Sequence, residues 1–309
     1  MDPIFEADLA TMKRREKEKS DALRKFMHFW KNGYPEPIRK LRQDLGPTGG
    51  HDWLALSASA RTEAATLILE DLSSATKAER RELSLVSSLL FASKEWCMPL
   101  ERASLISFEA IREEVNRTLA GQNYVGTIES GLYRDRKMRG AINKGVVSWH
   151  VHLFWIGHET QSLDAAIERF NSRHTSPLEG APAADWMPRS WDTVGARVTY
   201  MLKTPAKTYA ATYFSNYVDP GTGVISGRDV QWSRRIRPGE QVKQLNLVAE
   251  AYLDDLMIVG GRGWDWVASL QAAILRNRGG WMERYGEDEG LRGGLVREVP
   301  GAPNTNHQA

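Results

Sequence analysis

The stretch that decides the fold is Val146-Val147-Ser148-Trp149-His150-Val151-His152-Leu153-Phe154-Trp155-Ile156-Gly157. It is crowded with the β-branched and aromatic residues that favour strands, and glycines bound it at Gly145 and Gly157. We therefore predict one β-strand. Since side chains alternate between the faces of a strand, His150 and His152 lie on the same face. Two imidazoles placed in this way can bind one metal ion, although two buried structural histidines would give the same pattern.

A second strand is predicted over Tyr124–Glu129, and a basic turn from Arg134 to Gly145 joins it to the histidine strand. Strands joined as a hairpin pair antiparallel, so Glu129 is expected beside His150. Depending on the register, its carboxylate either reaches the histidine face or points to solvent at the strand end. An unpaired carboxylate on a buried face is costly, and a metal ion would remove that cost.

The rest of the chain is divided into four parts. Residues 1–80 are expected to be a helical extension without chemistry of its own, residues 81–218 the domain that contains the histidine strand, residues 219–285 a basic loop with helices, and residues 286–309 a disordered tail. The predicted elements are a strand over 83–92, a helix over Phe108–Leu119 capped by Ser107, a helix over Leu163–Phe170 capped by Ser162, a helix over Val194–Lys203 capped by Thr193, a strand over Thr212–Val218, a basic loop over Ser233–Gly239, and helices over Gln244–Met257 and Trp264–Leu275.

Composition excludes some classes of protein. Hydrophobic residues make up 41% of the chain and charged residues 26%, which is ordinary for a globular protein. We find no apolar run long enough for a membrane span and no apolar leader, and Cys97 is the single cysteine, so a cytoplasmic protein is expected. The net charge is only +2, but Arg197 to Lys243 holds eight basic and three acidic residues. Such a stretch suits nucleic acid, and equally a solvated basic face.

The predicted helix over Val194–Lys203 carries Tyr200 and Lys203, which are three apart and so lie on one face. With the motifs His150-Val151-His152 and Tyr200-Met201-Leu202-Lys203, residues 83–215 resemble the HUH endonucleases, and among them the rolling-circle replication initiator (Rep) proteins. Glu129 stands where some of these families keep a third metal ligand. We find no clear counterpart of the family's first motif on the strand expected at 84–92.

The resemblance implies an α+β fold with a central antiparallel sheet, of the HUH/Rep-like, ferredoxin-like or RRM-like kind, with helical extensions at both ends. It implies a metal-dependent nick in single-stranded or hairpin origin DNA, made by Tyr200 through a 5′-phosphotyrosine, with host helicase and polymerase as partners. His150, His152 and Glu129 would hold Mn²⁺ or Mg²⁺, and Lys203 would hold the phosphate or lower the pKa of Tyr200. The expected DNA-binding residues are Arg197, Lys207, Arg234, Arg235 and Arg237.

Other interpretations fit the same residues. Tyr209, Tyr213 and Tyr217 compete with Tyr200 as the nucleophile. The same two motifs serve HUH transposases and mobilisation relaxases, and a DNA-binding protein on this scaffold need not cleave. A cupin would place a glutamate four or five residues after the second histidine, whereas Glu159 is seven residues after it. A metallo-β-lactamase-type site would want Asp-His where Phe154-Trp155 stand.

Overall fold

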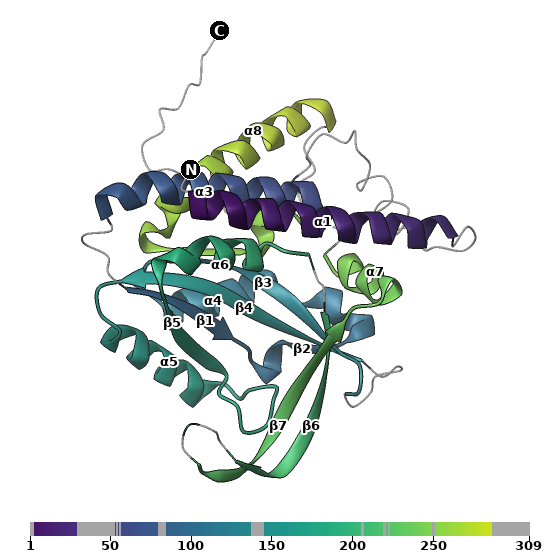
Figure 1. Cartoon of the computed structure of the whole chain (residues 1–309), viewed down its shortest axis with the longest axis vertical. Helices are drawn as coiled ribbons and strands as arrows, with labels where there is room; N and C mark the ends of the chain where they lie inside the picture. The colour runs from purple at the N-terminus through teal and green to yellow at the C-terminus, as the bar shows by residue number, and fades with distance from the viewer. Residues whose placement is uncertain are drawn as a thin grey trace.

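The computed structural model describes residues 3–29, 53, 55, 57–79, 85–136, 145–204, 207–218, 221, 223–248 and 251–285, which build an α+β fold (Figure 1). Its strands are β1 Leu85–Phe91, β2 Cys97–Pro99, β3 Tyr124–Tyr133, β4 Val146–Gly157, β5 Ala184–Arg189, β6 Lys207–Val218, β7 Ile225–Arg235 and β8 Met257–Gly260. Its α-helices are α1 Pro3–Phe29, α3 Ala58–Glu79, α4 Phe108–Thr118, α5 Gln161–Arg173, α6 Val194–Met201, α7 Pro238–Asn246 and α8 Ala268–Tyr285. Short 3-10 helices are η1 Lys94–Trp96, η2 Leu100–Leu105, η3 Trp191–Thr193, η4 Leu253–Leu256 and η5 Gly261–Val267.

The described strands form one sheet in the order β5-β1-β4-β3-β6-β7, with β2 added to β4 and β8 added to β3. Its pairings are antiparallel, including the predicted pairing of β3 with β4. The exception is one parallel bridge between Tyr133 of β3 and Tyr209 of β6. The sheet is therefore mixed rather than purely antiparallel as expected. Beyond the bridge, β6 and β7 continue as a two-stranded ribbon that projects from the body (Figure 1).

The alternation along β4 divides the core into two layers. Trp149, Val151 and Leu153 face one cluster, which includes residues of α4 and α5. Phe154 and Ile156 face the other cluster, which α1, α3, α6 and α8 cover. The two histidines of the strand continue this second face and are half-buried. The period-two pattern of the sequence thus places both histidines on the opposite face from Trp149, Val151 and Leu153.

Helix α6 lies between the sheet and the layer formed by α1, α3 and α8 (Figure 1). The hydroxyl of Thr127 on β3 donates a hydrogen bond to the carbonyl of Met201, the last residue of α6, at 2.9 Å. This bond ties the end of the helix to the strand that carries Glu129. No described helix is both long and apolar enough to cross a membrane.

Several predicted elements are confirmed. The strand over 146–157 has the predicted bounds, the weaker prediction near 83–92 is β1, and Tyr124–Glu129 is the first part of β3. Ser107 caps α4, since its hydroxyl accepts a hydrogen bond from the Ala110 amide at 3.1 Å. The strand expected at Thr212–Val218 is the outer half of β6.

Other expectations are wrong in detail. Helix α5 begins at Gln161 with Thr160 at its N-cap, so Ser162 is not the cap. Thr193 does stand at the N-cap of α6, but η3 runs directly into the helix and the Thr193 hydroxyl donates to the Ser190 carbonyl instead. Lys203 falls just beyond α6, whose C-cap is Leu202.

The region after residue 230 differs most from prediction. The supposed basic loop over Ser233–Gly239 is split between the end of β7 and the start of α7, with Pro238 at the first helical position. The helix expected over Gln244–Met257 is instead the end of α7, the short helix η4 and the start of β8. The helix expected over Trp264–Leu275 is preceded by η5 and begins only at Ala268. The predicted disordered tail, residues 286–309, lies outside the described residues.

Candidate active site

Glu129 and the two histidines come together because of strand register. In the antiparallel pairing of β3 with β4, Glu129 stands directly opposite His150, and Thr127 stands opposite His152. Directly opposed residues share a face of the sheet, so the carboxylate and both imidazoles converge. The ligand atoms of the three residues all lie within 4.8 Å of one another. The sequence left the register open, and the structure places Glu129 on the histidine face.

The tautomer of His150 suits a metal ligand. Its Nδ1 lies 3.1 Å from the Ser148 carbonyl oxygen, a partner that can only accept a hydrogen bond, so the proton belongs on Nδ1. The lone pair of Nε2 is then free for a cation, in the arrangement that commonly orients a metal-binding imidazole.

The protonation states are also those of ligands. Burial lowers the pKa of His150, and it lowers the pKa of His152 to about 3, so both imidazoles are neutral at pH 7. Burial alone would raise the pKa of Glu129, but the positive charge of Lys203 and its hydrogen bond to the carboxylate, together with the electrostatic influence of the neighbouring imidazoles, hold that pKa below its ordinary value. All three groups are therefore in the form that binds a cation.

The carboxylate of Glu129 has an unused oxygen. Its Oε2 accepts a hydrogen bond from the Lys203 ammonium at 3.3 Å, whereas its Oε1 is buried and has no hydrogen-bond partner. A buried carboxylate oxygen without a partner is costly, and a bound cation would satisfy it. Two nitrogens and one carboxylate oxygen fit Mn²⁺ or Mg²⁺ with further positions open for water or substrate. Glu129, His150 and His152 are thus the residues that can hold a divalent metal.

Tyr200 and Lys203 reach the metal-ligating residues from α6 and the turn after it. The Tyr200 ring meets the His152 ring edge-to-face, with centroids 5.3 Å apart. The Lys203 ammonium lies 3.3 Å from the centre of the Tyr200 ring and also pairs with Glu129. Tyr200, Lys203 and the three candidate metal ligands therefore lie together as predicted, and Lys203 contacts both Tyr200 and Glu129.

The acidity of Tyr200 differs from one expectation. Burial raises the pKa of its hydroxyl, the charge of Glu129 raises it further, and Lys207 and Arg197 oppose that rise. Lys203 lies over the ring face and does not lower the pKa of the hydroxyl below its ordinary value. The role of Lys203 that fits this geometry is positioning or holding charge, rather than acidifying the phenol.

The competing tyrosines are less well placed. Tyr209 is half-buried against Tyr133, with ring centroids 5.5 Å apart, and burial raises its pKa to about 12. Tyr213 stands further out on the ribbon. The side chain of Tyr217 lies outside the described residues. Tyr200 is 39% exposed and touches a metal-ligating histidine, which favours it as the nucleophile.

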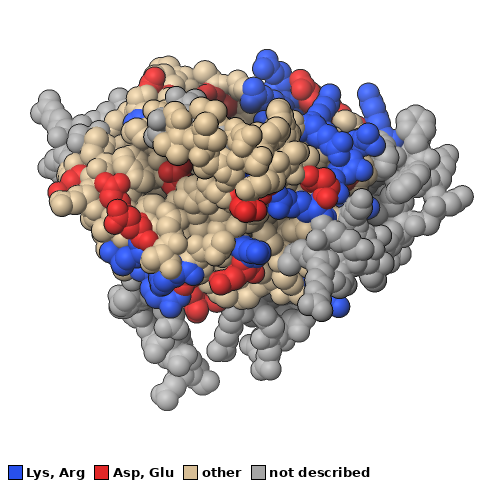
Figure 2. All heavy atoms as spheres, turned by 90° about the horizontal axis from the view of Figure 1, so that it is seen from below, with Lys and Arg blue, Asp and Glu red and all other residues tan. Residues whose placement is uncertain are grey.

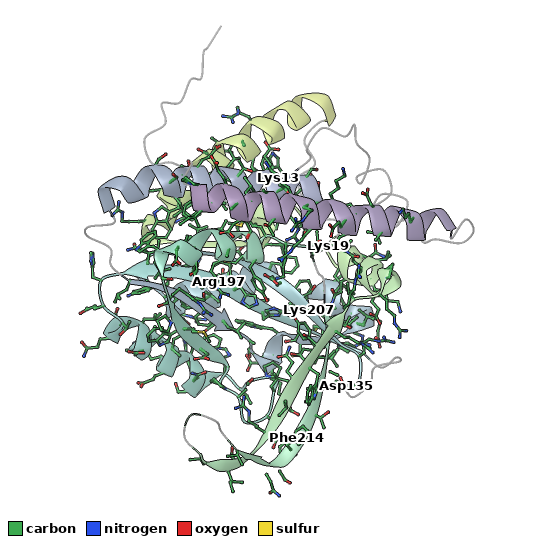
Figure 3. The ribbon with its side chains drawn as sticks, in the orientation of Figure 1. Lys13, Lys19, Asp135, Arg197, Lys207 and Phe214 are labelled. Carbon is green, nitrogen blue, oxygen red and sulfur yellow. The ribbon has the colours of Figure 1, made fainter. Side chains whose placement is uncertain are left out.

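The predicted DNA-binding residues form two groups. Arg197 lies on α6 and Lys207 at the root of the ribbon, and the charges of both act on Tyr200 (Figure 3). Arg234 and Arg235 end β7 opposite Thr208 and Lys207, while Arg237 caps α7 through its backbone. All but Arg197 have exposed side chains. The structure therefore gathers Arg197 and Lys207 near the tyrosine, with the other three on or beyond the ribbon root.

Sequence reasoning missed a set of buried polar residues that holds the turn carrying Lys203. Glu16 of α1 accepts a 2.6 Å hydrogen bond from the Thr204 hydroxyl and pairs with Lys19. Arg61 of α3 donates to the carbonyls of Leu202 and Lys203, each at 3.3 Å. We call Glu16, Lys19, Arg61 and Thr204 the buried clasp. The charged sequence of α1 gave no signal for it, because the contacts join residues far apart in the chain.

Known proteins provide no further guide to the site. Comparisons with protein-family models, with curated proteins and with solved structures find no match to this chain.

Proposed function

We propose that this chain is a metal-dependent endonuclease that nicks and rejoins single-stranded DNA, with Tyr200 as the nucleophile. The observation that carries the proposal is the convergence of Glu129, His150 and His152 beside an accessible Tyr200, with Lys203 between them. Structural histidine pairs are common, but here Oε1 of Glu129 is buried beside them without a hydrogen-bond partner, and a bound cation would satisfy it. A tyrosine beside such a centre suits phosphoryl transfer.

The proposed reaction joins Tyr200 to the DNA strand and consumes no further reactant. The Tyr200 oxygen forms a bond to phosphorus as the bond from phosphorus to the 3′ oxygen breaks. The phenol loses its proton to water, and the departing 3′ oxygen takes up a proton. The products are a 5′-phosphotyrosine and a free 3′-hydroxyl, and the reverse reaction rejoins the strand. A divalent ion at the three ligands would supply electrophilic stabilisation of the phosphate oxygens.

The residues around Tyr200 have defined tasks in this scheme. Because burial raises the pKa of the phenol, Tyr200 is protonated at neutral pH and gives up its proton in the course of the reaction. Lys207 and Arg197 favour the phenolate and are placed to hold a phosphate next to it. The ring contact with Lys203 restrains Tyr200 beside His152. Each task is electrostatic or positional, as expected when the chemistry is transfer of a phosphoryl group.

The biological role that we propose is initiation of rolling-circle replication of a plasmid or phage-like replicon. The support is the resemblance of the motifs to single-tyrosine initiators, with one Tyr-x-x-Lys segment after one His-x-His strand. Transposases and mobilisation relaxases would use the same cleavage. A plasmid that depends on this gene and its origin, and that fails to replicate with Tyr200→Phe, would separate replication from the other two roles.

The cleavage is tested by incubating the full chain with a pool of random single-stranded oligonucleotides and Mn²⁺, followed by denaturing electrophoresis. We expect a covalent protein–DNA adduct that needs Mn²⁺, disappears in Tyr200→Phe and persists in the matched control Tyr213→Phe. An adduct that survives Tyr200→Phe contradicts the assignment of the nucleophile. Binding without any adduct would instead favour a non-cleaving DNA-binding protein.

A further inference from the structure

The ribbon formed by β6 and β7 has more exposed apolar surface than its position explains. Of the thirteen large hydrophobic side chains that are exposed among the described residues, six belong to the ribbon or its tip; they are Tyr213, Phe214, Val218, Val224, Ile225 and Trp232. A two-stranded ribbon gains little stability in water by itself, and exposed aromatic residues add none. The gathering of these side chains on one projection indicates a binding surface.

One face of the ribbon is anchored to the body. Asp229 accepts a hydrogen bond from the Glu179 amide at 2.9 Å and forms an ion pair with Arg136. At the edge of β6, the Ala211 amide donates to the Asp135 carboxylate at 3.1 Å. Figure 3 shows Asp135 beside the ribbon, with Phe214 further toward its tip. The face that carries Asp229 and Tyr213 is therefore the inner one.

The opposite face carries the aromatic and basic side chains. Its cross-strand pairs, from the root outward, are Arg234 with Thr208, Trp232 with Ala210, Val230 with Thr212, and Arg228 with Phe214. Trp232 is 55% exposed beside the small Ala210, and Phe214 is 43% exposed. We call this the outer face. Large flat rings spaced along a strand, flanked by arginines, are the arrangement on which unpaired bases stack.

The charge of the ribbon complements a polyanion. Of the basic side chains of its described residues, Arg228 and Arg234 lie on the outer face, while Lys207 and Arg235 lie opposite each other on the inner face, which also carries the one carboxylate, Asp229, paired with Arg136. Viewed from below Figure 1, lysine and arginine side chains form a larger group at the upper right and a smaller one at the lower left, with acidic side chains among them (Figure 2). A partner with apolar contacts alone would not need this charge.

The ribbon begins at the candidate active site. A Cβ atom added at Gly131 would lie 3.4 Å from both the His150 ring and the Tyr209 ring, so the root of β6 borders the metal-ligating residues. From Lys207 to Phe214 the strand extends about 24 Å at ~3.4 Å per residue. Tyr209 shares the inner face with Tyr213 and Asp229, so a DNA strand that is held on the outer face would cross the ribbon root to reach Tyr200.

We propose that the outer face binds single-stranded DNA, with bases stacked on Trp232 and Phe214 and phosphates paired with Arg234. The choice of DNA as the nucleic acid rests on the proposed function. A ribbon can also enter the major groove of a duplex, but stacking on Trp232 and Phe214 requires bases that are not paired.

The test measures binding without cleavage. Fluorescence anisotropy of a labelled 20-nucleotide single strand and of the matching duplex is recorded with the full chain in EDTA. We expect Trp232→Ala and Phe214→Ala each to weaken single-strand binding by about 5- to 150-fold, which corresponds to one stacked base. Trp232→Phe should recover part of the loss. Tyr213→Ala, the neighbouring aromatic residue on the inner face, should leave the affinity within about twofold.

Three outcomes overturn the proposal. Unchanged affinity in correctly folded Trp232→Ala, checked by circular dichroism and thermal unfolding, removes the stacking role. If the protein binds the duplex more tightly than the single strand, and Trp232→Ala weakens both to the same extent, the ribbon binds duplex DNA instead. A change of oligomeric state in sedimentation, with no change in DNA affinity, makes the outer face an interface between copies. If the outer face binds DNA but no Tyr200 adduct ever forms, the proposed cleavage fails and the binding surface stands.

Discussion

Replacing Glu16 by alanine tests how the N-terminal helix supports the active-site turn. The Glu16 side chain is only 3% exposed, and its partner Lys19 is 22% exposed. Burial lowers the pKa of Lys19, and the charge of Glu16 opposes that effect. Alanine would leave the ammonium without its carboxylate and the Thr204 hydroxyl and amide without their acceptor.

The magnitude follows from these losses. Removing one partner of a buried ion pair costs about 3–5 kcal/mol, and part of that is the unpaired charge that remains. We expect Glu16→Ala to lower the free energy of unfolding by that amount in urea denaturation. The double variant Glu16→Met/Lys19→Met should recover a large part, because it removes both charges together.

The control is Glu18→Ala on the same helix, where the carboxylate is exposed and a change within about 0.5 kcal/mol is expected. Hydrogen exchange of the Thr204 amide should accelerate in Glu16→Ala and stay unchanged in Glu18→Ala. A loss below about 1 kcal/mol for Glu16→Ala, or equal losses for the two variants, would refute the view that the buried clasp holds this turn.

Three further predictions concern the sheet and the metal site. His150→Ala should weaken Mn²⁺ binding to the full chain by at least tenfold in calorimetry, as expected for loss of a ligand. The control His158→Ala, which removes an exposed histidine, should leave Mn²⁺ binding unchanged. Gly126→Ala should lower stability by about 3 kcal/mol in thermal unfolding, because the new Cβ would lie 2.1 Å from the His152 carbonyl oxygen; an unchanged melting temperature would contradict that close approach. Burial raises the pKa of Tyr124, whose hydroxyl donates a hydrogen bond to Asn116. The stability that this protonated hydroxyl contributes is complete below pH 10 and is lost as pH rises through the pKa of the folded state. Tyr124→Phe should therefore reduce the fall in stability above pH 10, and an alkaline profile identical to that of the unchanged protein would contradict this.

The strands of the site were predictable because their composition and alternation are strong. β4 was found with its full length, and the shared face of His150 and His152 follows from strand geometry alone. The convergence of Glu129 was only conditional, because the register of β3 on β4 depends on a connection whose conformation the sequence does not reveal. Tyr200 and Lys203 were placed by helical spacing, although Lys203 lies past the helix end.

The second strand of the ribbon, β7, and the region after it were mispredicted for a physical reason. β7 is exposed on most of its length, so it lacks the apolar alternation that identifies a half-buried strand. Pro238 and Gly239 suggested a loop, whereas proline fits the first turn of a helix because its missing N–H would be unpaired there. The helix expected over Gln244–Met257 is interrupted, because α7 ends at Asn246 and Leu253–Leu256 form the separate short helix η4.

The buried clasp could not have been predicted, because its contacts join α1 and α3 to a turn well over a hundred residues later. A charged helix usually indicates a solvated surface, and Glu16 shows no feature that separates it from its exposed neighbours. Tertiary packing alone selects which carboxylate is buried. The extension at residues 1–80 therefore contributes to the position of Lys203 even though it carries no metal-ligating residue of the cluster.

Mass spectrometry of the DNA adduct tests the central claim most directly. After nuclease digestion, trypsin separates Tyr200 from the other candidate tyrosines, since cleavage after Arg197 and Lys203 releases it in a six-residue peptide, Val198–Lys203, whereas Tyr209, Tyr213 and Tyr217 remain together in Thr208–Arg228. We predict a nucleotide phosphate attached to Tyr200 in the peptide Val198–Lys203. The modification should form with Mn²⁺ and be absent without it. A nucleotide attached to Tyr209 or Tyr213 instead, or a cleaved strand with no modified tyrosine, would contradict it.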